Sequence, residues 1–149
     1  MTPNEKSKVL SEALPYIKQF FGKIIVIKFG GNAMIDKNLK QSFAKDLVLL
    51  KLVGMNPVVI HGGGPQINES LAKSGEKPIF KEGIRVTNKK TLEIVTNVLN
   101  EVNQQIIELV KENGGDASSY SNEKTLSIIQ AKKLQAKEKS HDLGFVGEI

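Results

Sequence analysis

A lysine and two adjacent glycines stand together in the run Lys28-Phe29-Gly30-Gly31-Asn32, near the start of the chain. Because glycine has no Cβ, two in a row let backbone amides come close to a ligand, and such a turn can hold a phosphate. A lysine just before the turn adds a mobile positive charge that offsets phosphate oxygens during transfer. A plain strand-to-helix turn with a solvated lysine has the same pattern. The run alone leaves both readings open.

A second run, His61-Gly62-Gly63-Gly64-Pro65, points more strongly to a bound ligand. Three glycines in a row cost backbone entropy on folding, so they suit a place that a ligand must approach closely. The run follows a second predicted strand, and both loops can then open onto one crevice, as a phosphoryl donor and acceptor require. His61 is either a general base or a residue that orients the loop through hydrogen bonds. We favour the orienting role.

A lone arginine, Arg85, lies in the apolar run Gly83-Ile84-Arg85-Val86-Thr87, just before a predicted helix. Its planar guanidinium is suited to hold a carboxylate through two hydrogen bonds. A structural arginine paired with an acidic side chain fits the same pattern. Arg85 is therefore a candidate carboxylate-binding residue, with a structural role as the alternative.

The composition narrows the chemistry further. The 149 residues include no cysteine and two histidines, His61 and His141, which excludes a disulfide framework and a thiolate metal site and disfavours a histidine metal centre. We predict no metal ligand in this chain. Neither glycine loop matches GxxxxGK[ST] or GxGxxG, so the Walker and Rossmann sites lack their defining residues. We therefore predict a phosphate-binding site of a type other than the Walker and Rossmann sites.

Charge and hydropathy bear on partners and location. The formal net charge of +5 comes largely from dispersed lysines rather than from a basic face with interleaved aromatic residues. We therefore predict no nucleic-acid binding, while a modest positive field would suit small anionic substrates.

The chain has no apolar run of eighteen residues and no secretory signal at its start. We predict a cytoplasmic protein with no membrane association.

The elements that must position these residues alternate between strands and helices. Residues Lys23 to Lys28 form a β-branched run too short for a helix, which indicates a strand buried on both faces, and Asn56 to Ile60 is a second one. Between them, Asp36 is predicted to cap a helix that Gly54 ends. The remaining predicted elements are a helix at Gln66 to Lys73, a hairpin at Pro78 to Val86, a long helix capped by Thr87 or Asn88 and stopped at Asn113, and short strands at Ala117 to Tyr120 and Leu126 to Ile129.

This order predicts an α/β fold with a doubly wound, mainly parallel sheet and helices on both faces, an αβα sandwich. Ligands of such sheets bind at the carboxyl ends of the strands, where both glycine loops fall. Because the chain stops in the apolar run DLGFVGEI, we expect a truncated lobe with a sheet incomplete at its carboxyl end.

The first 21 residues are predicted to be an amphipathic helix kinked at Pro15, and residues 22–149 the lobe that it precedes. Leu10, Leu14, Ile17 and Phe21 follow one another at helical spacing. Because a leading helix has no obvious place in its own sheet, we expect this apolar face to bury against another subunit of a homo-oligomer.

Five motifs in this order resemble the amino-acid kinase family, and within it the kinases that phosphorylate N-acetylglutamate: KFGGNAM, the helix ending DLVLLKLVGMNP, VVIHGGGPQI, EGIRVT and DLGFVGE. The similarity covers residues 9–115 almost continuously and returns at 142–148. The resemblance implies that Lys28 is the phosphate-contacting, catalytic lysine and that Arg85 holds the substrate carboxylate. It further implies that one set of glycine-loop residues binds phosphate, namely Gly30, Gly31, Asn32 and Gly63. A second set would bind the acyl amino acid, namely Gly62, Gly63 and Gly64.

The resemblance implies MgATP-dependent transfer of a phosphoryl group to the side-chain carboxylate of N-acetyl-L-glutamate in arginine biosynthesis. The product would be an acyl phosphate. A carboxylate is already a nucleophile, so the reaction needs positioning and charge neutralisation more than a general base. The family's N-terminal helices link subunits, which implies a dimer or an arginine-responsive hexamer.

The chain departs from the family pattern in two ways. Residues 119–125 lack the glycines of the family's GLSGKDG stretch, and the nucleotide-binding second half is absent, so we expect the isolated chain to be an inactive, substrate-binding half. Two alternatives stay open. One is an amino-acid kinase with a different carboxylate substrate, such as aspartate, glutamate or acyl-aminoadipate. The other is a non-catalytic assembly or regulatory module.

Overall fold

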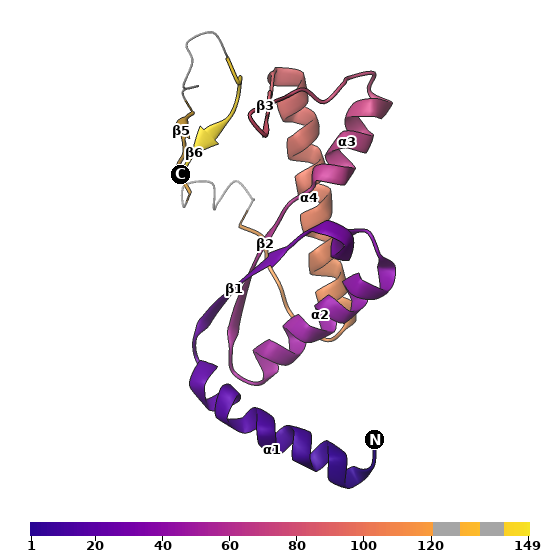
Figure 1. The fold of residues 1–149 in the computed structure, drawn as a ribbon, viewed down its shortest axis with the longest axis vertical. Helices are drawn as coiled ribbons and strands as arrows, with labels where there is room; N and C mark the ends of the chain where they lie inside the picture. Colours follow the sequence, from indigo (N-terminus) through magenta and orange to yellow (C-terminus); the bar gives the residue numbers. More distant parts are fainter. Residues whose placement is uncertain (121–128, 135–141) are drawn as a thin grey trace. The chain divides into compact units, whose positions relative to one another are not determined.

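A computed structural model describes residues 1–120, 129–134 and 142–149 of the chain (Figure 1). Two compact units make up the chain, and each is described by itself below. The first unit holds residues Met1–His61 and Glu108–Ala117, and the second holds Gly62–Ile107 and Ser118–Ile149. No helix in the described part of the chain is both long enough and apolar enough to cross a membrane.

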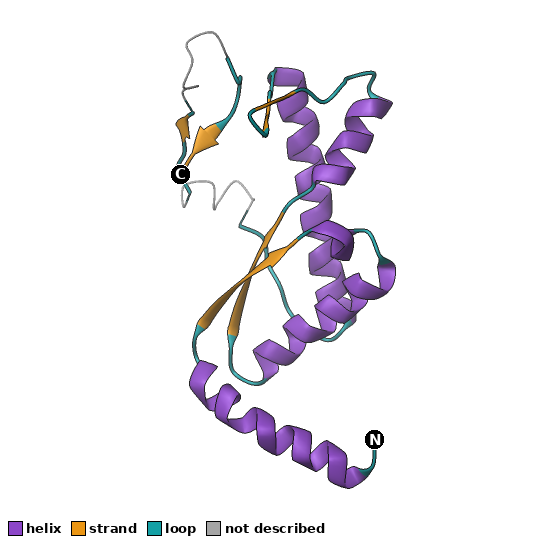
Figure 2. Ribbon diagram, viewed as in Figure 1, coloured by secondary structure: helices purple, strands orange, loops and turns teal. Residues whose placement is uncertain are grey.

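The first unit is built on a pair of parallel strands, β1 (Ile24–Phe29) and β2 (Asn56–His61). Between them the chain forms a short 3-10 helix, η1 (Gly31–Met34), and the helix α2 (Lys37–Leu52), as Figure 2 shows. The register pairs Ile24 with Asn56 at one end and Phe29 with His61 at the other. Both predicted strands are therefore confirmed, and each extends one residue beyond its predicted end.

Local sequence explains where α2 begins. The Asp36 carboxylate accepts hydrogen bonds from the backbone amides of Asn38 and Leu39, at 2.8 and 2.9 Å, which satisfies two amides of the first turn. Asp36 is thus the predicted N-cap.

The core of this unit lies between α2, the inner face of the strands and the last turn of helix α4. Ala44 and Leu47 are buried there, and the inner strand residues Ile27 and Val59 pack against them. At the carboxyl end of β1 the Phe29 ring stacks on Phe43, with centroids 4.0 Å apart. These contacts fix the end of β1, from which the first glycine loop leaves.

The outer face of the strand pair is uncovered, contrary to the expectation that β1 is buried on both sides. Ile24, Val26 and Ile60 are 70%, 62% and 59% exposed, and exposed and less exposed residues alternate along β1. The expectation was wrong for the described residues because α2 and α4 lie on the inner face and no described element covers the outer one. The α/β class with parallel strands is confirmed.

Helix α1 (Pro3–Phe20) precedes the strands and extends away from them in Figure 1. Thr2 and Glu5 form a reciprocal capping box at its start, and Pro15 stands inside one continuous helix. None of its residues is buried. Just after it, the Phe21 ring occupies the space into which a Cβ on Gly54 would project.

The second unit contains α3 (Gly64–Lys73), the hairpin β3–β4 (Phe80–Lys81 and Ile84–Arg85), most of α4 (Lys89–Glu112) and the pair β5–β6 (Lys132–Lys133 and Gly147–Glu148). Its core joins α3 to α4 through the buried residues Ile67, Leu71 and Val98. The Asn88 side chain accepts a hydrogen bond from the Thr91 amide at 2.8 Å, so Asn88 acts as the predicted cap. The predicted hairpin and long helix are confirmed.

The predicted strand at 117–120 is absent among the described residues. Ala117 instead packs against the core cluster of the first unit, as the strand residues Ile27 and Val59 also do, so side-chain packing rather than a regular strand ladder holds the start of this segment. The predicted strand at 126–129 falls mainly outside the described residues.

A segment near the end of the described chain lies beside the residues that follow the hairpin. Gly144 pairs there with Thr87 in a parallel bridge. The Thr87 amide donates to the Leu143 carbonyl at 2.9 Å, and the Phe145 amide donates to the Thr87 carbonyl at 2.7 Å. Asp142 accepts from the Gly144 amide at 2.9 Å and pairs with Lys133 at 3.3 Å, and these two contacts hold the pKa of Asp142 below its ordinary value. The DLGFVGE motif therefore braces the segment that follows Arg85.

Gly144→Ala should destabilise the protein by about 2–4 kcal/mol, because the residue has φ +73° and a Cβ there would overlap the Thr87 carbonyl. Gly75→Ala is the matched control, since Gly75 has the same φ but no atom within 4 Å of the added Cβ. It should cost only about 1 kcal/mol from backbone strain. Urea unfolding followed by circular dichroism measures both, and equal losses would contradict the overlap.

Candidate functional site

Lys28 lies on the uncovered face of the strand pair, one residue before the end of β1. It alternates with Ile24 and Val26, and its register partner on β2 is Ile60. The last residue of the strand is Phe29, which is 4% exposed and points to the inner core. Side chains alternate along a strand, so the buried ring fixes Lys28 outward at the carboxyl end of the sheet.

The first glycine turn follows directly. Gly31 has φ +62°, a conformation that residues with a Cβ rarely adopt. No other atom lies within 4 Å of the place that a Cβ on Gly30 or Gly31 would take. The space beside both residues is therefore open, as close approach of a phosphate requires. Asn32 is the second residue of the 3-10 helix η1.

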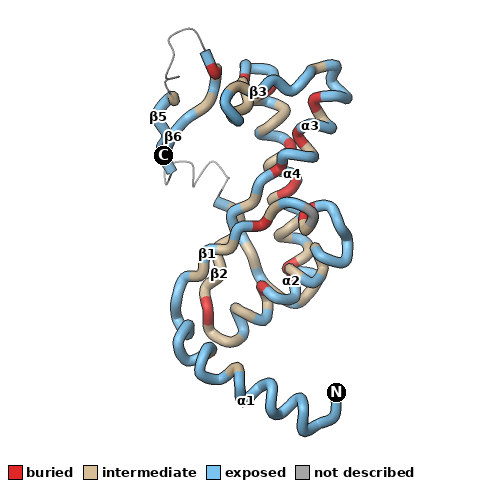
Figure 3. The backbone as a smooth tube through the Cα atoms, in the orientation of Figure 1, coloured by how far each residue is buried: buried red, intermediate tan, exposed pale blue. Residues whose placement is uncertain are grey.

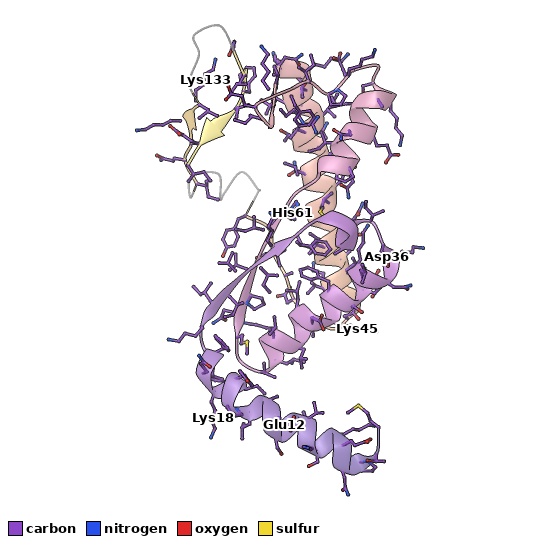
Figure 4. The ribbon with its side chains drawn as sticks, viewed as in Figure 1. Glu12, Lys18, Asp36, Lys45, His61 and Lys133 are labelled. Atoms are coloured by element: carbon purple, nitrogen blue, oxygen red, sulfur yellow. The ribbon has the colours of Figure 1, made fainter. Side chains whose placement is uncertain are left out.

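The second glycine run leads from β2 into α3. His61, which Figure 4 labels, is the half-buried last residue of β2. Gly62 and Gly64 are exposed and have open space beside them. Gly63 is buried, and a Cβ there would lie 2.9 Å from the Leu99 side chain. Gly63 thus has a structural reason to be glycine that is independent of any ligand.

The start of α3 is suited to an anion. Gly63 is its N-cap and supplies no side chain to the free amides of the first turn. Uncapped amides at a helix start carry partial positive charge and favour negative groups. The ten-residue helix therefore presents an end suited to an anion next to the glycine run.

Arg85 is tied to α3 and to its own hairpin. Its Nη2 donates to the Asn68 Oδ1 at 2.6 Å, and its guanidinium lies 4.6 Å from the centre of the Phe80 ring. Partial burial lowers the pKa of Arg85 from its ordinary value. The Nη1 atom is buried and donates no hydrogen bond within the described part of the chain. Arg85 forms no ion pair with an acid there either, which leaves its charge available.

The structure thus groups the candidate residues in two sets. Lys28, Gly30, Gly31 and Asn32 belong to the first unit, and Gly62, Gly63, Gly64 and Arg85 belong to the second. Both glycine runs leave the carboxyl ends of strands that pair with each other. Among the described residues, no three His, Cys, Asp or Glu side chains come together in a way that could hold a metal ion.

Sequence reasoning missed both neighbours of Arg85. Phe80 pairs with Arg85 across the hairpin, so the predicted hairpin register could have identified it. Asn68 lies 17 residues before Arg85 on another element, and no local pattern links the two.

A model of the amino acid kinase family matches residues 23–148 of the chain. The chain belongs to the amino acid kinase family. Among curated members, it is 54% identical to the acetylglutamate kinase of Polynucleobacter necessarius over 155 residues, which cover 100% of this chain and 51% of that protein. It is 53% identical to the acetylglutamate kinase of Methylobacillus flagellatus, with 99% of this chain and 52% of that protein covered. The chain therefore spans about half the length of these relatives.

Solved structures agree with the family's fold. N-acetylglutamate synthase from Neisseria gonorrhoeae, complexed with coenzyme A and N-acetyl-glutamate, superposes with a TM-score of 0.76 over 93% of this chain and 31% of that one. At 22% identity, this likeness shows the fold alone. A Streptococcus mutans protein aligns at 29% identity with a TM-score of 0.55, over 61% of this chain and 37% of its own.

Proposed function

We infer that the chain is the acceptor-binding half of an N-acetylglutamate kinase, which transfers the γ-phosphoryl group of ATP to the side-chain carboxylate of N-acetyl-L-glutamate. The observation that carries this inference is the identity of 49% to 54% to proteins named acetylglutamate kinase, over nearly the whole chain. The reaction would serve arginine biosynthesis in the cytoplasm.

The site chemistry suits this reaction. A carboxylate oxygen of the acceptor forms a bond to the γ-phosphorus while the bond from that phosphorus to the leaving oxygen of ADP breaks. Lys28 offsets the charge on the transferring group, and the amides beside Gly30 and Gly31 bind its oxygens. Arg85 holds the other carboxylate of the acceptor. The acceptor is ionised before the reaction, so this chain needs no proton-transfer residue.

Arginine at position 85 is itself informative. The chain has one arginine among its 21 basic residues, and every other one is lysine. A lysine would supply the same charge but not the planar pair of donors that a carboxylate accepts. The use of arginine at this position therefore supports a role that depends on guanidinium geometry.

ATP would be used with Mg²⁺, the usual counter-ion that neutralises its phosphates. The described residues offer no cluster of carboxylates for the metal, so we assign no residue of this chain to it and no step to its coordination.

The direct test is acyl-phosphate formation, trapped with hydroxylamine. The chain should give no product alone and should give product when co-expressed with the carboxyl-terminal half of the Polynucleobacter kinase. N-acetylglutamate should be the preferred acceptor over aspartate, glutamate and N-acetyl-aminoadipate. Preference for one of the others would replace the proposed substrate, and an inactive but well-assembled pair would favour a non-catalytic module.

We also propose that α1 joins subunits into a homo-oligomer. Leu10 and Leu14 are 69% and 49% exposed, so much of the apolar face predicted from the sequence is uncovered in the described residues. Figure 3 shows most of α1 exposed. Burying such a face against a second copy would remove it from water.

Deleting residues 1–20 from the co-expressed enzyme should lower its molar mass in light scattering. Replacing Leu10 and Leu14 with serine should do the same. Replacing Lys8 and Glu12 with serine is the matched control, because these residues form an exposed pair on the same helix. An unchanged mass after the deletion would show that α1 is not the contact.

A further inference from the structure

Arg85 is the centre of a small arrangement within the second unit that the proposed reaction does not by itself explain. Asn68 approaches it from α3, one turn after the glycine run, and Phe80 approaches it from the opposite strand of the hairpin. Asn68 lies four residues after Gly64, which is about 6 Å along the helix axis. One short helix thus links the glycine run to the partner of Arg85.

The two neighbours restrict the guanidinium in different directions. Its five N–H groups lie in one plane, and an acceptor must approach within that plane. Phe80 lies over a face of the group, where no hydrogen bond can form, and Asn68 accepts in the plane from Nη2. The Nη1 atom is buried and has no hydrogen-bond partner among the described residues. Nη1, together with the second hydrogen of Nη2, forms an edge suited to a carboxylate.

We propose that Asn68 and Phe80 are positioning residues, which hold Arg85 so that its Nη1 edge binds a carboxylate of the acceptor. This proposal rests on the proposed function for the identity of that acceptor. Phe80 is 52% exposed, so its ring can shift to admit the ligand while it still covers one face of the guanidinium.

The chemical type of residue 68 is the critical point. Arginine has only donors, so the Asn68 side chain must present its carbonyl oxygen. This oxygen is a neutral acceptor, which orients the guanidinium without cancelling its charge. An aspartate in its place would form an ion pair and compete with the incoming carboxylate. The arrangement therefore predicts that a negative charge at position 68 is worse than no side chain.

Arg85 provides its own reporter, because it is the only arginine in the chain. In the ¹⁵N-labelled 149-residue chain, the arginine Nε–Hε region should hold one signal, and the exchange rate of the Nη groups reports rotation of the guanidinium. Asn68→Ala should speed this rotation. Asn97→Ala, at an exposed position on α4, is the control and should leave it unchanged.

The same samples are then titrated with N-acetyl-L-glutamate at matched ionic strength. The Kd should rise by about tenfold in Asn68→Ala, because binding must then immobilise a guanidinium that rotates freely, and it should rise further in Asn68→Asp. Phe80→Tyr should bind nearly as the parent chain does, while Phe80→Leu should bind more weakly. Unfolding midpoints of all variants separate these effects from loss of the fold.

Unchanged guanidinium rotation in Asn68→Ala would overturn the positioning role, as would an Asn68→Asp chain that binds as tightly as the parent. Faster rotation in Asn68→Ala with no response of any chain to N-acetyl-L-glutamate would overturn the carboxylate site and its proposed ligand. In that case Asn68 would remain only a structural partner of Arg85. The rotation experiment thus fails separately from the proposed function.

Discussion

Lys28→Ala is expected to reduce the turnover of the co-expressed enzyme by about 100- to 1000-fold, the usual effect of removing one group that stabilises transition-state charge. The reason is the position of Lys28 at the carboxyl end of β1, on the uncovered face and next to the open Gly30-Gly31 turn. The loss should fall on kcat, because the charge it offsets develops during transfer. Steady-state kinetics with hydroxylamine trapping measure it.

Lys23→Ala is the matched control for this variant. Lys23 is an exposed lysine immediately before the other end of the same strand, so its loss removes the same charge from the chain. Its turnover should stay close to that of the parent enzyme. Equal losses in the two variants would attribute the effect to net charge and would remove Lys28 from the catalytic machinery.

Arg85→Lys should raise the KM for N-acetylglutamate by about 10- to 150-fold, corresponding to about 1.5–3 kcal/mol for hydrogen bonds to a charged group. The KM for ATP should change much less. An ammonium keeps the charge but cannot offer two donors in one plane, nor can it make the same contacts with Asn68 and the Phe80 ring.

The ratio of the two effects decides the role of Arg85. A rise confined to the acceptor KM assigns Arg85 to the acceptor. A similar rise for both substrates, together with a lower unfolding midpoint, would show that Arg85 mainly supports the hairpin and α3.

Much of the fold was predictable because its signals are local. The strand at β1 follows from a short β-branched run before two glycines, and α2 and α4 follow from helical spacing with caps at Asp36 and Asn88. The hairpin follows from the turn at Gly83, which has φ +78°. In each case the residues that determine the element are neighbours in sequence.

The features that sequence reasoning missed depend on contacts between distant segments. An apolar β-branched run does not tell which segment covers each of its faces, so the exposure of Ile24 and Val26 was not foreseen. Likewise, Gly63 was interpreted only as a ligand-binding glycine, but its contact with Leu99 depends on how α3 meets α4. Asn68 reaches Arg85 through the same tertiary arrangement.

The contact between Phe21 and Gly54 has a consequence for how the sequence can evolve. Gly54 has φ +90°, which strains any residue with a Cβ, and the aromatic ring also fills the space that such a residue would need, so loss of the ring at position 21 should remove one of the two penalties on substitution. The order of the two changes then matters, and a descendant with both could be reached more easily through position 21. Scanning all substitutions at position 54, in the parent and in a Phe21→Ala background, would reveal this dependence as a wider tolerance in the second library. An identical tolerance in both would mean that the two positions vary independently.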